Sequence, residues 1–143
     1  SEAYLLLIES DFNRTKNLAK NLLEKRYQRH FRIKEITNEV EERILKKIKE
    51  KIIFEGDFNW KLTELGPVAS RICHRYQKPI FLFKIDEKES QGAVRTPQGI
   101  DSVKLMAKCG QFLETYGGHP LASGFKIKNE NLEKFKNCLI KHL

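Results

Sequence analysis

The stretch GGHPLASGF, residues 117–125, gathers the residue types best suited to chemistry in this chain. Gly117 and Gly118 can adopt positive φ and let a ligand approach bare backbone N–H groups. His119 adds a donor that can carry positive charge near neutral pH. These three residues predict an anion site, with phosphate as the anion. The alternative is a glycine-rich turn between a helix and a strand, and the local residues do not decide between the two.

The overall charge also favours an anionic partner. The 143 residues include 27 Lys and Arg against 19 Asp and Glu, which gives a net charge of +8 and a pI of about 9.4. Such a balance fits nucleic acid, polyphosphate or an acidic membrane face, although a lysine-rich genome produces the same numbers. With 40% hydrophobic and 32% charged residues, the chain has the composition of a folded domain rather than of a disordered segment.

The cysteine pattern predicts no disulfide and no metal site. Cys73, Cys109 and Cys138 are odd in number and widely spaced, which argues against a disulfide framework and for a reducing cytoplasm. No pair has an obvious metal-ligand spacing, and Cys73 with His74 is expected to lie on a helix. The apolar run over residues 4–8 is too short for a membrane span and lacks the basic flank of a signal peptide.

Every glycine and proline lies at or after Gly56, so we expect a helical arm over residues 1–52 and an α/β body over residues 53–143. The arm predicts a short helix over residues 3–8 and a restart at Ser10 or Asp11, where either residue can cap a helix. Apolar residues then recur at helical spacing up to Ile52, as in an amphipathic helix that packs on another element. The pattern leaves open whether the arm is one helix or two.

A basic cluster interrupts the apolar stripe of the arm. Tyr27 and Phe31 interleave its positive residues, and aromatic rings among cations can track a phosphate backbone. The alternative is the solvated face of a helix. The candidate nucleic-acid contacts in this cluster are Lys25, Arg26, Arg29 and Arg32.

The body predicts a mixed sheet flanked by helices, an α/β (α+β) fold. Pro79 precedes IFLFKI, a nearly continuous apolar run typical of a strand buried on both faces. The other expected elements are a strand near residues 51–55, a helix from Gly66 and Pro67 to Tyr76, a strand over 91–95, a helix capped by Asp101 or Ser102 that ends at the double glycine, a strand over 125–128 and a closing helix from Asn131.

Four separated segments resemble, in the same order, the C-terminal half of RecJ-type phosphoesterases of the DHH superfamily. The resemblance covers the DHH-associated substrate-binding domain and the connecting helix before it, and therefore nearly the whole chain. The segments are AYLLLIESDFNRTKNLAKNLLEKR, Trp60 with LGPVASRICHRYQKPIFLF, QGAVRTPQGID and GGHPLASGF.

The resemblance implies a domain that faces a catalytic domain across a cleft for single-stranded nucleic acid or a small nucleotide. It implies that Arg95 and the loop of Gly117, Gly118 and His119 hold phosphate oxygens, with Thr96 as an added hydroxyl donor. Lys61 and Arg71 are further candidate nucleic-acid contacts. A guanidinium fork and exposed backbone N–H groups both suit phosphate.

The resemblance also implies what this chain lacks. The family holds two manganese or similar ions, magnesium included, with an aspartate-rich set that contains an Asp-His-His run, and this sequence has none. We therefore predict no catalytic residue, no metal ligand and no cofactor in this chain. Lys61, Pro67 and Val94 depart from the exonuclease pattern, which bears on substrate handling rather than on the fold.

Three functions follow from the resemblance. The first is a single-strand DNA or RNA binding domain of a RecJ-like exonuclease, which works with a DHH catalytic domain in the same or another chain. The second is a non-catalytic replication or repair accessory that acts as a scaffold beside the helicase complex and other replication proteins. The third is a fragment of an oligonucleotide or cyclic-dinucleotide phosphodiesterase. All three imply a cytoplasmic protein without a membrane partner.

Overall fold

The computed structural model describes residues 1–143, which divide into two compact units, Ser1–Arg32 and Ile33–Leu143. Helix α1 (Glu2–Lys46) contributes to both units. The expected break near Ser10 is absent, because the backbone stays helical from Glu2 onward. The boundary between the units also differs from the predicted one at residue 52, because the apolar stripe after Arg32 packs into the body.

Within the second unit, the C-terminal part of α1 contributes one buried stripe to the core. Ile33, Ile36, Val40 and Ile44 are all buried, at the three- to four-residue spacing of one helix face. The predicted continuation of the stripe fails at Ile48, which is 55% exposed, because α1 ends at Lys46.

Within the first unit, the helix buries none of its large apolar side chains. Phe12, Leu18 and Leu22 are each 60% exposed or more. Their spacing predicted a helix correctly, but the apolar residues have no packing partner within this unit.

The body contains one five-stranded mixed sheet with the strand order β1-β2-β3-β5-β4. Its strands are β1 (Ile53–Asp57), β2 (Ile80–Ile85), β3 (Glu89–Arg95), β4 (Thr115–His119) and β5 (Ala122–Lys128). Only β1 and β2 are parallel, and all other neighbours are antiparallel. The predicted mixed sheet flanked by helices with an N-terminal helical segment is confirmed, as is the central buried strand IFLFKI.

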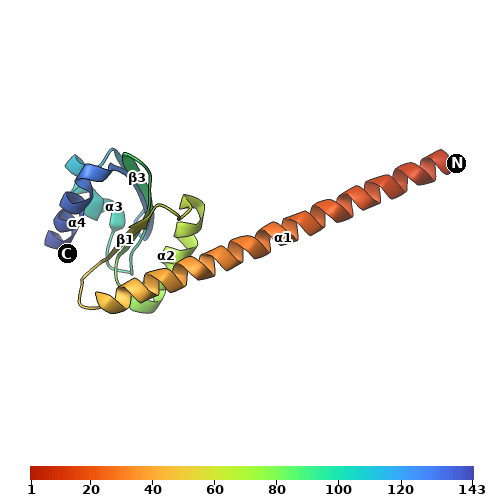
Figure 1. The fold of residues 1–143 in the computed structure, drawn as a ribbon. Helices are drawn as coiled ribbons and strands as arrows, with labels where there is room; N and C mark the ends of the chain where they lie inside the picture. The colour runs from red at the N-terminus through yellow and green to blue at the C-terminus, as the bar shows by residue number, and fades with distance from the viewer. The chain divides into compact units, whose positions relative to one another are not determined.

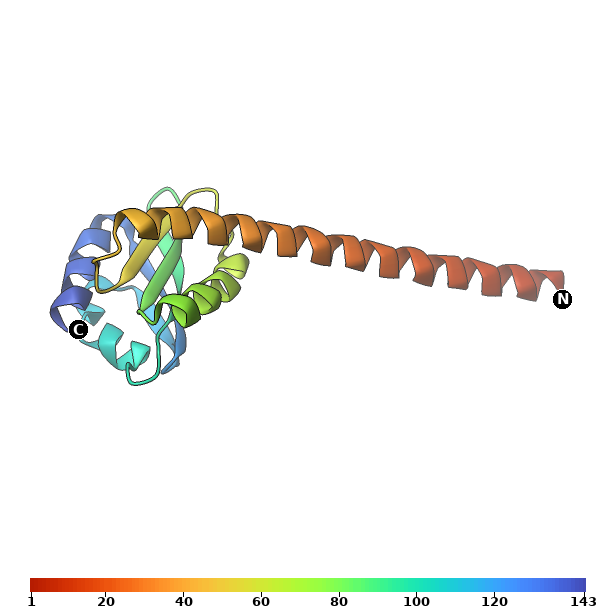
Figure 2. The ribbon, with the colours of Figure 1, turned by 90° about the horizontal axis from the view of Figure 1, so that it is seen from below.

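Two helical layers cover the sheet (Figures 1 and 2). Helix α2 (Leu62–Tyr76) and the C-terminal part of α1 pack on one face, and α3 (Ser102–Ala107) and α4 (Leu132–Lys141) pack on the other. Because successive strand residues point to opposite faces, Ile80 and Leu82 of β2 join the first core while Phe81 and Phe83 join the second.

Helix α2 begins earlier than predicted. It starts at Leu62, so Pro67 lies inside the helix and not in its first turn. Trp60 lies two residues before this start and fixes the chain there. Its side chain is 2% exposed, and its Nε1 donates to Glu39 Oε2 of α1 at 3.0 Å. The helix ends at Tyr76 as expected, where Gln77 adopts φ 52° as the C-cap.

The segment after β3 differs most from prediction. Asp101 caps α3 as expected, since its carboxylate accepts from the N–H groups of Val103 and Lys104. However, α3 ends at Ala107, and a 3-10 turn, η1 (Gly110–Phe112), leads into β4. Gly117 and Gly118 therefore lie in an edge strand, not in a loop at a helix end.

The chain closes as the sequence predicted. A 3-10 turn, η2 (Asn129–Asn131), connects β5 to α4, whose Phe135 and Leu139 are fully buried. No helix has the length and apolar character needed to cross a bilayer.

Candidate phosphate-binding site

Arg95 ends β3 and points its side chain toward α2. Its Nε donates to Ser70 Oγ at 3.0 Å, and its Nη1 donates to the carbonyl of Val94 at 2.9 Å. Nη2 makes no hydrogen bond within the chain. A Cβ at Gly66 would lie 2.9 Å from Nη2, so the glycine of α2 leaves room for the guanidinium. The side chain is thus oriented by neutral oxygens and keeps donors available.

The charge of Arg95 has no carboxylate partner. None of the ion pairs in the structure includes it. Burial lowers the pKa of Arg95, while the neighbouring Cys73 acts in the opposite direction. Burial raises the pKa of the Cys73 thiol, and the charge of Arg95 partly offsets that rise. Since a guanidinium stays protonated, Arg95 is a partly desolvated cation without a counter-ion, which favours binding of an anion.

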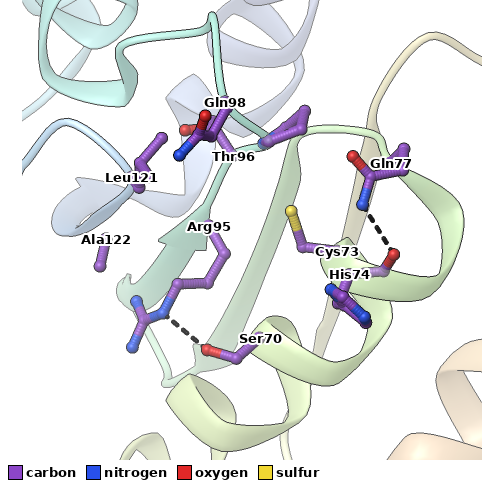
Figure 3. A pocket seen from close by; sticks show the side chains of 10 residues that line it. Ser70, Cys73, His74, Gln77, Arg95, Thr96, Gln98, Leu121 and Ala122 are labelled. Atoms are coloured by element: carbon purple, nitrogen blue, oxygen red, sulfur yellow. Dashed lines mark hydrogen bonds between the residues drawn. The ribbon is translucent and has the colours of Figure 1, made fainter.

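Arg95 borders an open cavity of about 450 Å³ between α2 and the ends of β3 and β5 (Figure 3). One wall consists of Ser70, Cys73 and His74 of α2 and of Gln77, the residue that follows the helix. The three residues of α2 follow an i, i+3, i+4 pattern, so they share one helix face, which Gln77 extends. Sequence reasoning missed this wall, although the spacing was visible. The remaining lining residues are Arg95, Thr96, Pro97, Gln98, Leu121 and Ala122.

His119 lies in the same cross-strand row as Arg95. Ala122 of β5 pairs with Arg95 on one side and with His119 on the other. Directly paired residues share a sheet face, and two strand spacings separate the outer Cα atoms by about 10 Å. The imidazole of His119 is exposed and makes no hydrogen bond within the chain, so it remains available to the same ligand.

Gly117 and Gly118 have different structural surroundings. Gly118 has φ +137°, and a Cβ there would meet Ser123 Cα at 2.7 Å and Ala122 O at 2.8 Å. The fold itself therefore requires a glycine at this position. A Cβ at Gly117 would meet nothing within 4 Å, so no neighbour in the chain requires glycine there. Gly117 lines a second open cavity of about 380 Å³ with Gly124 and Lys126.

Thr96 has a structural role in this arrangement. It is buried, and its hydroxyl lies 2.8 Å from the carbonyl oxygen of Ile100 and 3.1 Å from that of Pro120. Its backbone N–H donates to Leu121 O. Because a hydroxyl has one proton and both neighbours are acceptors, Thr96 fixes the turn and does not present the donor that was predicted for phosphate.

The other predicted contacts lie apart from the cavity. Lys61 precedes α2 and Arg71 is exposed on it, and neither lines the cavity. The cluster of the arm lies on α1 in the first unit, where Tyr27 is 80% exposed and Phe31 63% exposed. Its cationic residues are Lys25, Arg26 and Arg29, which are exposed, and Arg32, which is half-buried. The structure brings Arg95, Gly117, Gly118 and His119 together on one region of the sheet but does not test the ligand.

The prediction that no cysteines pair was wrong. Cys109 and Cys138 form a disulfide with Cα atoms 5.9 Å apart. Wide spacing in sequence did not prevent pairing, because the segment after α3 and helix α4 pack on the same face of the sheet. His142 joins these cysteines in the one group of ligand-type side chains that could share an ion. Magnesium and manganese prefer oxygen ligands, so this sulfur and imidazole set does not fit the ions that the resemblance implies for the catalytic domain.

The family comparison matches most of the body. The DHHA1 domain family matches residues 44–143. Among similar proteins, the single-stranded-DNA-specific exonuclease RecJ of Bacillus subtilis (strain 168) is 25% identical over 139 residues, which cover 95% of this chain and 18% of that protein. A prophage-derived protein of the same organism, YorK, named as a candidate single-strand DNA-specific exonuclease, is 35% identical over 122 residues, which cover 74% of this chain and 21% of that protein.

Solved structures agree with this match. RecJ of Thermus thermophilus in complex with Mn²⁺ is 28% identical, with a TM-score of 0.59, and the match covers 74% of this chain and 17% of that chain. The C-Ala domain of Aquifex aeolicus alanyl-tRNA synthetase has a TM-score of 0.56 at 12% identity, over 63% of this chain and 87% of that domain. The second likeness concerns the fold alone. The chain spans about a fifth of the curated relatives it matches.

Proposed function

This chain belongs to the DHHA1 domain family, and from that premise we propose that it binds the phosphate backbone of single-stranded nucleic acid as the substrate-binding part of a RecJ-like exonuclease. The observation that carries the proposal is the guanidinium of Arg95, which borders a cavity, has no carboxylate partner and shares a cross-strand row with His119.

The physical argument begins with the unpaired charge. Charge-assisted hydrogen bonds from a guanidinium to phosphate are among the stronger polar interactions, and Ser70 already fixes the orientation of this side chain. His119 supplies a second donor on the same row. Only the small side chain of Ala122 lies between Arg95 and His119 in this row, and Gly117 of the edge strand has no side chain, so a phosphate backbone can approach the sheet closely.

A nucleic acid is favoured over a single small phosphate by the rest of the molecule. The net charge of +8 supports a polyanionic partner. The similar proteins are named for single-stranded DNA. Hydrolysis would then require a DHH catalytic domain with manganese or magnesium, in the same or another chain, and the complex would act in the cytoplasm. The scaffold and the small-nucleotide phosphodiesterase remain outcomes of the test below.

The test is a titration of fluorescent oligothymidylate with the purified chain over a range of salt concentrations. Loss of one charge-assisted contact predicts that Arg95→Ala weakens binding by about tenfold or more. It also lowers the slope of log K against log salt by about 0.7, the value for one phosphate of a single strand. Arg14→Ala is the matched control, since it removes the same charge from an exposed position of α1 outside the proposed contacts.

Other outcomes would redirect the proposal. Equal affinities for the parent and Arg95→Ala proteins would remove Arg95 from the site. No binding of any oligonucleotide, together with recovery of replication proteins, would favour the scaffold. Tighter binding of a dinucleotide than of a long strand would favour the small-nucleotide phosphodiesterase.

A further inference from the structure

Cys109, Cys138 and His142 form a cluster on the face of the sheet opposite Arg95. Cys109 precedes η1 and is fully buried in the core under α3 and α4. Cys138 lies on α4, and His142 is the C-cap of the same helix. Arg95 instead contacts Ser70 of α2, in the other layer. The cluster is therefore separate from the phosphate site.

The geometry brings three ligand atoms within one ion's reach. The two sulfurs and a ring nitrogen of His142 all lie within 4.8 Å of one another. The Sγ of Cys138 lies 3.8 Å from Nδ1 of His142, and ligand atoms around tetrahedral zinc are about 3.6–3.8 Å apart. Cys138 and His142 are four residues apart on one helix, so a single turn of α4 aligns them.

We propose that the reduced form of this chain binds Zn²⁺ through Cys109, Cys138 and His142, and that the Cys109–Cys138 disulfide and the zinc site exclude each other. In the oxidised form the sulfurs are bonded to each other and supply no thiolate. A reductant of the dithiol class transfers two electrons and two protons to the disulfide and becomes a disulfide itself, and this reduction yields two thiols in the chain. Zinc binding then releases the two thiol protons and forms two sulfur–zinc bonds.

The reverse step needs a two-electron oxidant of the peroxide class. Two thiolates lose two electrons to form the disulfide, the peroxide takes these electrons and two protons to give two molecules of water, and the ion is released. The exchange requires little rearrangement, because the disulfide already holds both cysteine backbones close together.

The donor set selects the ion. Two thiolates and an imidazole suit zinc, whereas magnesium and manganese prefer carboxylates and water. Cys109 is buried, but His142 is exposed, so water can reach the fourth position. Nδ1 of His142 lies 2.9 Å from the carbonyl oxygen of Cys138 and must turn from it to meet the ion.

The test uses Co²⁺ as a spectroscopic probe for Zn²⁺ in the 143-residue chain. Reduced protein, prepared without oxygen, is expected to bind one Co²⁺ with the sulfur-to-cobalt charge-transfer absorption and the visible bands of a tetrahedral site, and Zn²⁺ should displace it. Oxidised protein is expected to show neither signal. Cys138→Ser and His142→Ala should each weaken binding by at least about 100-fold, more than loss of an outer-shell partner does.

Cys73→Ser is the matched control, because Cys73 is the one free cysteine and is buried outside the cluster. It should bind Co²⁺ as the parent chain does. His142→Ala keeps the test decisive if Cys138→Ser fails to fold, since His142 is exposed. Reduced parent protein without a thiolate charge-transfer signal would overturn the proposal. So would a signal that persists in His142→Ala at the affinity of the parent chain.

Discussion

Gly117 and Gly118 show how two identical neighbours can serve different purposes. The backbone conformation of Gly118 and its contact with Ser123 explain that glycine from within the fold. Nothing within the chain explains Gly117, whose missing side chain leaves open space above the sheet. Gly117 lies two residues before His119 on the edge strand, and the proposed approach of a ligand would account for a glycine that the fold does not need.

This difference predicts opposite effects of two alanine substitutions. Gly118→Ala places a Cβ at positive φ against the backbone of β5, so we expect a loss of about 1–3 kcal/mol in the free energy of unfolding. Gly117→Ala meets no neighbour, so its free energy of unfolding should stay within about 1 kcal/mol of the parent value. Urea denaturation measures both.

For nucleic-acid binding, the larger effect is expected from Gly117→Ala, the variant with the smaller expected effect on stability. Gly117→Ala should bind oligothymidylate more weakly than the parent protein while it remains fully folded. If Gly117→Ala were stable and bound as tightly as the parent chain, the glycine would have no role in ligand approach. If Gly118→Ala were as stable as the parent chain, the strand would have to relax at this position in a way that the structure does not show.

The secondary structure elements divide into those with a clear sequence signal and those without one. The run IFLFKI predicted β2, and of the two predicted caps of α3, Asp101 and Ser102, the structure has Asp101. The prediction from Pro67 placed the start of α2 too late in the chain. Proline prefers the first turn of a helix, but this preference is weaker than the packing of the buried Trp60, which lies next to the true start. Strand β4 gave no alternation of apolar and polar residues, because all five of its residues are exposed at the sheet edge.

The arrangement of the proposed phosphate site was predictable only in part for the same reason. The choice of Arg95, Gly117, Gly118 and His119 as site residues rested on the family resemblance. The pairing of Arg95 and His119 with Ala122 instead depends on strand register. Register is a long-range property that the local pattern of an exposed edge strand does not specify. The cavity-lining residues of α2 have a visible helical spacing, but nothing in the sequence showed which face of the sheet this helix covers. The disulfide was missed because it too depends on which elements share a layer.

The disulfide connects the segment before β4 to helix α4. It links cysteines 29 residues apart, and the loop that it closes contains the whole β4–β5 hairpin. Closure of a loop of this length constrains the unfolded chain and stabilises the fold by about 3–4 kcal/mol. We therefore expect reduction to lower the free energy of unfolding by about that amount, measured by urea denaturation with a metal chelator present.

Cys138→Ser provides the control for this measurement. Its free energy of unfolding should be the same with and without reductant, because the remaining cysteines cannot form the native pair. If the parent protein were equally insensitive to reductant, the disulfide would contribute nothing to stability. A normal response in Cys73→Ser would show that the effect belongs to Cys109 and Cys138.

At the level of the whole chain, binding and hydrolysis are expected to separate. The sheet presents a cationic site on the side of α2 and a cysteine–histidine cluster on the side of α3 and α4. Two-metal hydrolysis of a phosphodiester needs hard oxygen ligands that hold two ions beside the substrate. The cluster contains two sulfurs and an imidazole, and no carboxylate group accompanies Arg95.

We therefore expect the purified 143-residue chain to bind labelled single-stranded DNA without cleaving it, with either manganese or magnesium in the buffer. The measurement is release of nucleotides over time, with binding of the same strand followed in parallel. Trace contamination by another nuclease is distinguished by Arg95→Ala, which would leave contaminant activity unchanged. Metal-dependent cleavage that falls with the loss of Arg95 would contradict the prediction, because catalysis would then have to arise from residues of this chain. Cleavage that appears only when a DHH catalytic domain is added would instead place the chemistry in that domain and substrate binding in this one.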